Sequence, residues 1–457
     1  MAPIIPAPDS RNPEGAEAPG GEAICYRMQP SRQVVGGQSC DAVETAPANQ
    51  MPPCLLSDQQ HSLVDLEGIH RVALMVTPQA DGDTIDQAWE AMSTVRAILR
   101  QQSVPMQVTL QTVFLRSSED AEPCRRLFEA YYGDRMPATT FVLQPPCGGQ
   151  ALAIEAWAVG GPNVTTSNIE PDVICVEYDG LRWLYFGNIV PPADVRNSGA
   201  QSRKIFDDFA QRLRRANATL ADVVRIWLYV GGITEIEDGR ERYRELNRAR
   251  TEFFEAEHAA GRILTQPSGA IVYPASTGIG VSGLSMATCC MALQSERDDV
   301  CLQPLENPHQ TSAFDYGERY SAKSPKFSRA MAMTVGDYST IWVSGTASIV
   351  NSETVHIGDV EGQTEQTIDN IENLISRENC ERHGLTGSGA ELRHLAKARV
   401  YVKHQRDYEN CRRVVERRLG SVPVVYARAD VCRPDLLVEI EGVAFAPRAA
   451  DQPESAV

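Results

Sequence analysis

The sequence predicts an α+β protein of three tandem modules, and three observations lead to that class. One order of elements occurs three times along the 457 residues: an amphipathic helix, a strand, a charged helix and a closing strand. Helices that return the chain to the same sheet produce a helical layer over one face of that sheet. The 42% hydrophobic and 23% charged content is ordinary for a globular chain, and the length suffices for several modules.

The first copy of the repeat spans residues 86–159. Apolar side chains at helical spacing predict a helix at 86–101, and alternating apolar residues predict a strand at 108–115. A charged helix at 121–133 and an apolar closing strand at 151–159 complete the unit.

The other two copies follow the same order. In the second copy, the helix, strand, charged helix and closing strand cover 205–213, 223–230, 241–255 and 286–293. In the third copy, they cover 368–375, 398–402, 407–420 and 436–446. The repeats predict three modules, at 59–165, 170–298 and 299–447. A Pro- and Gly-rich segment at 1–58 and a tail at 448–457 are predicted to be disordered.

Composition excludes several classes of protein. A net charge of −17 argues against nucleic-acid binding, and no run of 18 apolar residues predicts a membrane-spanning helix. The first segment carries neither an apolar signal core nor an Arg-rich amphipathic pattern. Twelve cysteines without C-x-x-C spacing are expected to be free thiols in a reducing cytoplasm, and His356 with Asp359 lacks a third metal ligand.

The closing strands differ at the positions where chemistry could reside. Aligning their I-E-(A/G)-x-A cores places Glu155 with Glu441 and Ala153 with Glu439, and the second copy has no acidic residue there. Residues two apart on a strand share a face, so Glu439 and Glu441 point the same way. Two carboxylates in the apolar strand LLVEIEGVAFA require partners or a raised pKa, unless both lie on a solvated face of an edge strand.

The repeated unit resembles the RidA/YjgF superfamily, and residues 170–447 resemble a chorismatase. The segments that carry this resemblance are ERYRELNRAR, PASTGIG, ENPHQTSAFDYGERYSAKSPKFSRA, VSGTASIV with HIGD, and VYARADVCRPDLLVEIEG. Because superfamily members form trimers with ligand sites at subunit boundaries, three modules in one chain imply a covalent pseudo-trimer. Whether the chain is a monomer or forms a further homo-oligomer stays open. The first module looks like an addition to the usual chorismatase length.

The resemblance implies a cofactor-free enzyme that cleaves the enolpyruvyl ether of chorismate. Glu439 is the expected acid, which protonates the methylene carbon so that pyruvate can leave. In the family, a Gly in the S-G-T-A-S segment and a Cys seven residues before the acid mark the branch that makes 3-hydroxybenzoate. Gly345 and Cys432 occupy those positions here. The alternative product is a dihydroxycyclohexadiene carboxylate, formed by hydrolysis.

Chorismate carries two carboxylates, which a guanidinium can bind with two parallel hydrogen bonds. The candidate ligands are Arg319, Arg428 and Arg412, together with Tyr316 and Tyr320. Each of these residues could instead have a purely structural role: an arginine could form a surface ion pair, and a tyrosine could pack against its neighbours.

The chain departs from the family pattern at three positions, His309, Phe314 and Asp315. These departures keep open a noncatalytic small-molecule binding protein. An imine or enamine deaminase like the simpler superfamily members is a further alternative. The arginine that those deaminases place about fifteen residues before the acid falls here near Val424, which argues against it.

Overall fold

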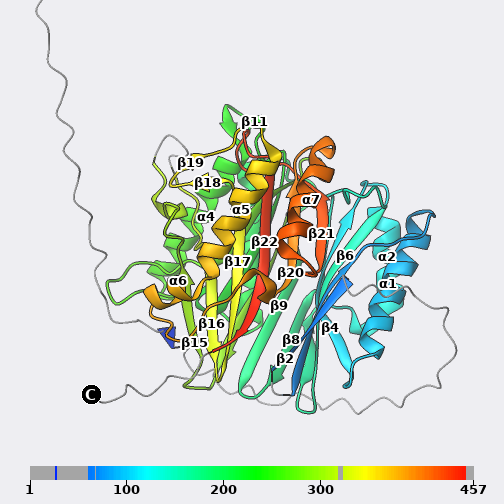
Figure 1. Ribbon diagram of the computed structural model, residues 1–457, viewed down its shortest axis with the longest axis horizontal. Helices are drawn as coiled ribbons and strands as arrows, with labels where there is room; N and C mark the ends of the chain where they lie inside the picture. Colours follow the sequence, from blue (N-terminus) through cyan, green and yellow to red (C-terminus); the bar gives the residue numbers. More distant parts are fainter. Residues whose placement is uncertain (1–25, 28–59, 67, 318–322, 449–457) are drawn as a thin grey trace, which may run out of the picture.

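The computed structural model describes residues 26–27, 60–66, 68–317 and 323–448, and three β-sheets with outer helices make up this part of the chain (Figure 1). The first sheet has the strand order β2-β3-β6-β4-β5. Its strands are β2 (His61–Leu66), β3 (Ile69–Val76), β4 (Met106–Leu115), β5 (Ala138–Val142) and β6 (Leu152–Gly160).

The second sheet has the order β13-β10-β14-β9-β8-β7. Its strands are β7 (Thr165–Glu170), β8 (Val173–Tyr178), β9 (Leu181–Ile189), β10 (Val223–Gly231), β13 (Ala275–Val281) and β14 (Met286–Ser295).

The third sheet has the order β1-β15-β16-β17-β22-β20-β21. Its strands are β1 (Tyr26–Arg27), β15 (Cys301–Leu305), β16 (Ala330–Val335), β17 (Tyr338–Ala347), β20 (Leu395–Val402), β21 (Val424–Arg428) and β22 (Val438–Pro447). Two short hairpins, β11 (Ile236–Glu237) with β12 (Arg240–Glu241) and β18 (Ile349–Val350) with β19 (Glu353–Thr354), lie outside these sheets.

All three sheets share one five-strand pattern. In each, the closing strand lies between a strand of the first hairpin and the strand that follows the first helix, and that strand pairs in parallel with a short edge strand. The predicted three-module α+β fold is therefore confirmed. The sequence repeat was incomplete, because it began at the first helix and missed the hairpin before it and the short parallel strand.

The helices lie on the outer face of their own sheet. They are α1 (Thr84–Arg100) and α2 (Ala121–Tyr132), α3 (Ser198–Arg215) and α4 (Arg242–Ala259), and α5 (Val360–Ile375), α6 (Arg377–Arg382) and α7 (Tyr408–Leu419). In Figure 1, α1 and α2 cover the sheet at the right, and α5 and α7 cover the sheet in the centre. Each module encloses its own apolar cluster between helices and sheet, so the predicted helix faces are confirmed.

A fourth apolar cluster joins the three modules. It contains side chains from the inner faces of all three sheets, including Trp157, Trp183, Trp342, Tyr229 and Tyr401. Trp183 and Trp342, from the second and third sheets, lie with ring centroids 5.7 Å apart. The sheets thus surround a shared core, which is the arrangement expected of a pseudo-trimer within one chain.

Two expectations need correction. Tyr26 and Arg27, within the segment predicted to be disordered, pair with Leu302 and Cys301 at the edge strand β15, where unpaired backbone groups are available. Cys301 is disulfide-bonded, so the prediction of free thiols is wrong at that position, although the eight other cysteines that the structure describes are free.

Nearly all of segments 1–58 and 448–457 lies outside the described residues. The proposed module boundaries at 59–165, 170–298 and 299–447 stay a prediction.

Candidate functional site

A cavity of about 320 Å³ lies between the second and third modules. The second module contributes residues of α4, among them Tyr243 and Asn247. The third module contributes β17, the segment before β16, and the loop and first residues of β22. The volume is in the lower part of the range of small-molecule pockets.

Glu439 points into this cavity from β22. It is 4% exposed and pairs in register with Tyr401 on β20 and with Ala347 on β17, so it lies in the middle of the sheet and not at an edge. Burial, together with the neighbouring Glu441 carboxylate, raises the pKa of its carboxyl to about 8 against the opposing effects of Arg225 and Arg329. Glu439 is therefore protonated at neutral pH and able to donate a proton.

Gly345 makes room for that carboxyl. The β17–β22 register shifts between Val343 and Thr346, which places Gly345 in a bulge opposite the acid pair. A Cβ at Gly345 would lie 2.0 Å from Oε1 of Glu439, closer than any side chain can approach. The Gly345 N–H donates to Oγ1 of Thr277 at 2.9 Å, which fixes the bulge to the second module.

Cys432 and Tyr316 also line the cavity. Burial raises the pKa of the Cys432 thiol to about 12, and the nearby Glu439 acts in the same direction. The thiol is therefore neutral and unsuited to act as a nucleophile. The Tyr316 hydroxyl accepts a hydrogen bond of 2.5 Å from Nη2 of Arg329.

Most of the residues that line the cavity were not among the predicted site residues, and four of these are Arg329, Arg433, Tyr243 and Asn247. Arg329 is 3% exposed and holds its guanidinium by donating to the Thr311 carbonyl at 2.9 Å. All four lie inside the segments that carry the family resemblance, so the resemblance could have selected them. Their place in the lining follows from how α4, the segment before β16 and the loop before β22 pack around the cavity, which the sequence motifs do not show.

Two predicted arginines lie away from the cavity. Arg428 is exposed at the end of β21, where its N–H donates to the Pro145 carbonyl at 2.8 Å. Arg412 is half-exposed on α7 and forms ion pairs with Glu409 and Glu416 at 3.2 and 3.6 Å. Neither belongs to the lining, because the inner surface of this boundary comes from α4 and the loop before β22.

Arg319 and Tyr320, which were also predicted to bind the substrate, lie outside the described residues.

The three departures from the family pattern do not line the cavity. His309 is exposed, and its N–H donates to Oδ1 of Asn307 at 2.8 Å. Phe314 packs on Tyr273 with ring centroids 5.4 Å apart, and Asp315 is exposed. These changes therefore leave the walls around Glu439 intact.

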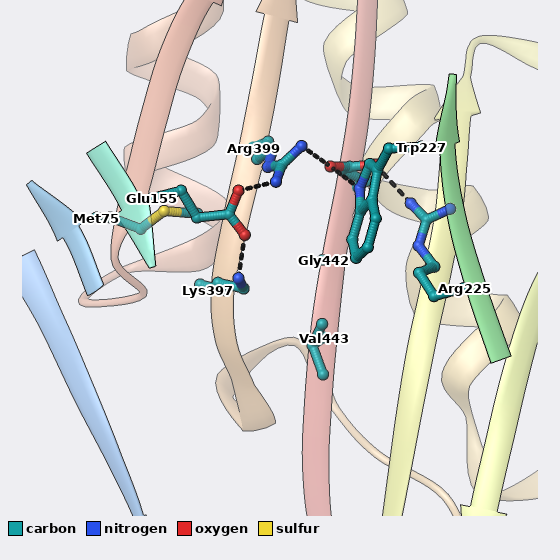
Figure 2. A pocket seen from close by; sticks show the side chains of 9 residues that line it. Met75, Glu155, Arg225, Trp227, Lys397, Arg399, Gly442 and Val443 are labelled. Carbon is teal, nitrogen blue, oxygen red and sulfur yellow. Dashed lines mark hydrogen bonds and ion pairs between the residues drawn. The ribbon is translucent and has the colours of Figure 1, made fainter. Parts of the chain in front are cut away.

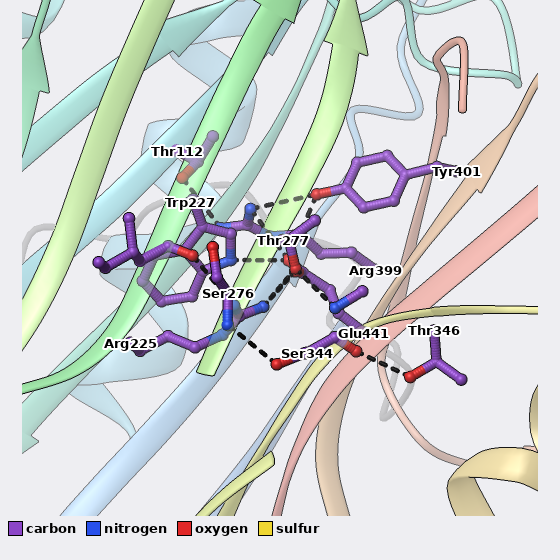
Figure 3. Close-up of polar contacts among 12 residues, drawn as sticks. Thr112, Arg225, Trp227, Ser276, Thr277, Ser344, Thr346, Arg399, Tyr401 and Glu441 are labelled. Carbon is purple, nitrogen blue, oxygen red and sulfur yellow. Dashed lines mark hydrogen bonds and ion pairs between the residues drawn. The ribbon is translucent and has the colours of Figure 1, made fainter. Parts of the chain in front are cut away.

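Glu441 shares the face of Glu439 but has a different environment (Figure 3). Its carboxylate pairs with Arg225 at 2.5 Å and with Arg399 at 3.1 Å. Trp227 Nε1–H donates to it at 2.9 Å, and the Thr277 hydroxyl also donates to it. The two acids, two residues apart, are thus divided into a neutral acid in the cavity and an anion in the core.

The ion pairs continue from Glu441 into the first module (Figure 2). Arg399 also pairs with Glu155 on β6, and Lys397 binds the other side of that carboxylate. Burial opposes the charge, but Arg399 and Lys397 together hold the pKa of Glu155 below its ordinary value. The space among these groups is about 10 Å³, so it is a packed polar core with room for about one water molecule and not a substrate site.

The register shows which residues of the other modules correspond to the acid. Glu439 lies opposite Tyr401, Ala153 lies opposite Phe114 on β4, and Ala287 lies opposite Tyr229 on β10. The closing strands of the first and second modules therefore carry alanine at this position. Among the described residues, no group of three or more His, Cys, Asp or Glu side chains could hold a metal ion.

The fold and the site together define an α+β pseudo-trimer with an acid-bearing small-molecule cavity between two modules. A family model described as the N-terminal part of FkbO/Hyg5-like chorismatases matches residues 155–292. A chorismatase of Streptomyces rapamycinicus is 38% identical over 301 residues, which cover 63% of this chain and 81% of that protein. A 3-hydroxybenzoate synthase of Streptomyces hygroscopicus is 35% identical, and the match covers 63% of this chain and 80% of that protein. The chain belongs to the chorismatase family.

A solved chorismatase structure corrects the interpretation of the first module. It aligns over 83% of this chain and 100% of its own length, with a TM-score of 0.58 and 24% identity. That share is larger than residues 170–447 take up, so the first module belongs to the chorismatase fold and is not an addition to it.

Proposed function

We propose that this protein cleaves the enolpyruvyl ether of chorismate and releases pyruvate, with Glu439 as the acid. The observation that carries the proposal is the neutral Glu439 carboxyl, which faces a cavity at a module boundary in a chain of the chorismatase family. A carboxylic acid with its pKa near the working pH is suited to donate a proton to carbon and to take one back.

The proton step balances within the site. Glu439 transfers its proton to the terminal methylene carbon, which becomes a methyl group, and the positive charge develops on the adjacent ether carbon. An oxygen nucleophile attacks that carbon and returns its own proton to the Glu439 carboxylate, which regenerates the acid. After attack by water, the bond from this carbon to the C3 oxygen of the ring breaks, that oxygen takes a proton, and pyruvate leaves. After attack by the C4 hydroxyl, the C4–O bond breaks and the C3 proton is lost as the ring aromatises. The bond to the C3 oxygen then breaks, that oxygen takes a proton as the phenol, and the former C4 oxygen leaves as the carbonyl oxygen of pyruvate.

Cationic side chains of the cavity suit the two carboxylates of the substrate. Arg329 and Arg433 both line the cavity, and each guanidinium lies over the Tyr316 ring, at 5.6 and 5.1 Å from its centroid. This stacking restrains the planes of the two guanidinium groups at the wall of the cavity, and their positive charges suit the substrate carboxylates. In this arrangement Tyr316 orients the two arginines and lies beside the bound substrate.

We favour 3-hydroxybenzoate as the second product, with hydrolysis to a dihydroxycyclohexadiene carboxylate as the alternative. Pyruvate and 3-hydroxybenzoate together contain the atoms of chorismate, so this route consumes no water. The C4 hydroxyl of the substrate then takes the place of water as the nucleophile. Gly345 and Cys432, both beside Glu439, support this branch, because the family resemblance associates them with it.

Incubation of the purified chain with chorismate tests the proposal. We expect pyruvate release, an aromatic product identified by chromatography, and a loss of about 10²–10⁴-fold in kcat for Glu439→Gln. Glu129→Gln, on the exposed surface of α2, is the matched control and should keep full activity. Absence of pyruvate would contradict the enzyme, and binding without turnover would favour a small-molecule binding protein. Ammonia release from an imine or enamine would favour the deaminase.

The other expected properties are a small-molecule substrate, a reaction without a cofactor and a cytoplasmic location. Eight free cysteines among the described residues support the cytoplasm, and the disulfide at Cys301 argues against it. None of the described helices is long and apolar enough to cross a membrane.

A further inference from the structure

We propose that Glu441 is a positioning residue for the reaction: its carboxylate, held as an anion in the core, keeps the neighbouring Glu439 protonated and ready to donate. This inference rests on the proposed function for its catalytic consequence, while the protonation itself can be measured without substrate.

The two carboxyl groups are close because of strand geometry. Residues two apart on a strand project from the same face about 7 Å apart. Both side chains are almost fully buried, at 4% and 3% exposed, so water screens their repulsion poorly. Two neighbouring carboxyl groups in such a setting do not both ionise without cost, and the one with the better partners keeps the charge.

The partners decide which group is the anion. Glu441 has two arginine ion pairs and donors from Trp227 and Thr277, and the Tyr401 hydroxyl lies 3.3 Å from its Oε1. Among the described residues, the ion pairs of β22 end on Glu441 and none ends on Glu439. The negative charge is therefore fixed on Glu441, and the proton stays on Glu439.

The surrounding groups are consistent with this assignment. The titratable and charged groups facing the pair are Arg225 and Tyr229 on β10, Arg399 and Tyr401 on β20, Cys289 on β14, Tyr243 on α4, Arg329 before β16 and Cys432 before β22, with Glu155 on β6 reaching it through Arg399. Arg225 and Arg329 favour ionisation of Glu439, and Glu441 is the neighbouring anion that opposes them. Removing Glu441 would leave the arginines unopposed.

The Thr277 hydroxyl connects the anion to the wall of the site. It donates to Glu441 and accepts the N–H of Gly345, the residue over which the Glu439 carboxyl lies. The same network that fixes the charge on Glu441 therefore fixes the backbone beneath the acid. Ser344, beside it, is held through its own hydroxyl by the Ser276 N–H at 2.9 Å (Figure 3).

The pH dependence of kcat/KM tests the proposal. In the unmodified enzyme, activity should fall as the pH rises through about 8, where Glu439 loses its proton. In Glu441→Gln the midpoint of this fall should move to lower pH by between about one and two units, the effect of one charge at 7 Å in an effective dielectric near 20. Glu441→Asp, which keeps the charge, should keep a midpoint near that of the unmodified enzyme.

A second variant gives the opposite sign. Arg225→Gln removes a cation from the same site, so the midpoint should move to higher pH. A merely structural loosening would lower the rate in both variants without moving their midpoints in opposite directions. Unmoved midpoints, or midpoints that move in the same direction in both variants, would overturn the proposal.

Infrared spectroscopy keeps the proposal testable if these core variants fail to fold. The difference spectrum between the unmodified protein and Glu439→Gln should show a protonated carboxyl band at pH 7 that is lost as the pH rises through about 8. Absence of the band at pH 7 would overturn the assignment. Because no substrate is present, this result stands apart from a failure of the chain to cleave chorismate.

Discussion

At the scale of residues, this protein separates two glutamates of one strand into an acid and an anion. The distinction arises from partners and not from sequence, since Glu439 and Glu441 lie on the same apolar strand with only Ile440 between them. The neutral form of Glu439 lies in the wall of a cavity, and the charged form of Glu441 lies among arginines. Charge placement of this kind has a measurable effect on stability.

We predict that Glu439 destabilises the folded protein as the pH rises. Its pKa is about 8 when folded and 4.5 ordinarily, so the unfolded chain ionises first and the free energy of unfolding falls between about pH 4.5 and 8. The loss amounts to about 3 kcal/mol at pH 7. Glu439→Gln should therefore be more stable than the unmodified protein at pH 7 and about equally stable near pH 4.5. Denaturant unfolding at the two pH values measures this difference. Glu129→Gln serves as the control, and an equal difference at both pH values would contradict the prediction.

At the scale of elements, the bulge of β17 decides where the Glu439 carboxyl lies. Strand register places Gly345 against the acid, and the absence of a side chain leaves the space that the carboxyl occupies. The loop before β22 brings Cys432 to the same place. Two separate elements thus shape the surroundings of the Glu439 carboxyl, the proposed proton donor.

We predict that Gly345→Ala displaces the Glu439 carboxyl. The new methyl group would lie 2.0 Å from Oε1, so the side chain must move and the proton must be delivered from a different position. A displacement of about 1 Å at a reacting group costs on the order of 100-fold in rate. We expect kcat to fall by this factor. We also expect a larger share of the hydrolytic product, measured by chromatography of the two products. Gly317→Ala is the control, because Gly317 is exposed and, among the described residues other than its chain neighbours, a Cβ there would meet no atom within 4 Å.

The sequence predicted elements better than it predicted the site. The helix at 86–101 and the strand at 223–230 match α1 and β10 closely, because apolar periodicity reports the buried face directly. Glu439, Gly345 and Cys432 were found through motifs. Arg329 and Asn247 were not, since a motif shows that a residue matters but not which way its side chain points. Arg428 was selected from a family-matching motif and Arg412 from the preceding helix, and the fold directs both side chains to the surface.

At the scale of the whole molecule, buried ion pairs connect the three modules. Glu155 from the first sheet, Arg399 and Glu441 from the third and Arg225 from the second form one continuous chain of charges. The first module has alanine where the third has its acid, yet Glu155 contacts the chain of charges that ends beside that acid. Its contribution to the enzyme is therefore structural and electrostatic.

We predict that Glu155→Ala destabilises the protein by about 3–5 kcal/mol, because Arg399 loses one of its anionic partners and Lys397 loses its ion-pair partner in the core. Adding Lys397→Met to this variant should recover part of the loss, since the buried ammonium is then removed too. Denaturant unfolding of the single and double variants measures both changes. A loss below about 1 kcal/mol for Glu155→Ala would show that water reaches these charges.

The axis where the three sheets meet has a further consequence, which concerns symmetry. In a trimer of identical subunits, every residue on the axis faces two copies of itself, so a buried glutamate there would meet two more glutamates. Here the corresponding positions of the three closing strands hold Glu155, Cys289 and Glu441. Their partners on the neighbouring strand of each sheet are Thr112, Trp227 and Arg399, respectively. Joining the three units into one polypeptide frees each of these positions to change alone. Opposite charges can then lie together in the core of the molecule, where exact threefold symmetry would place three identical charges.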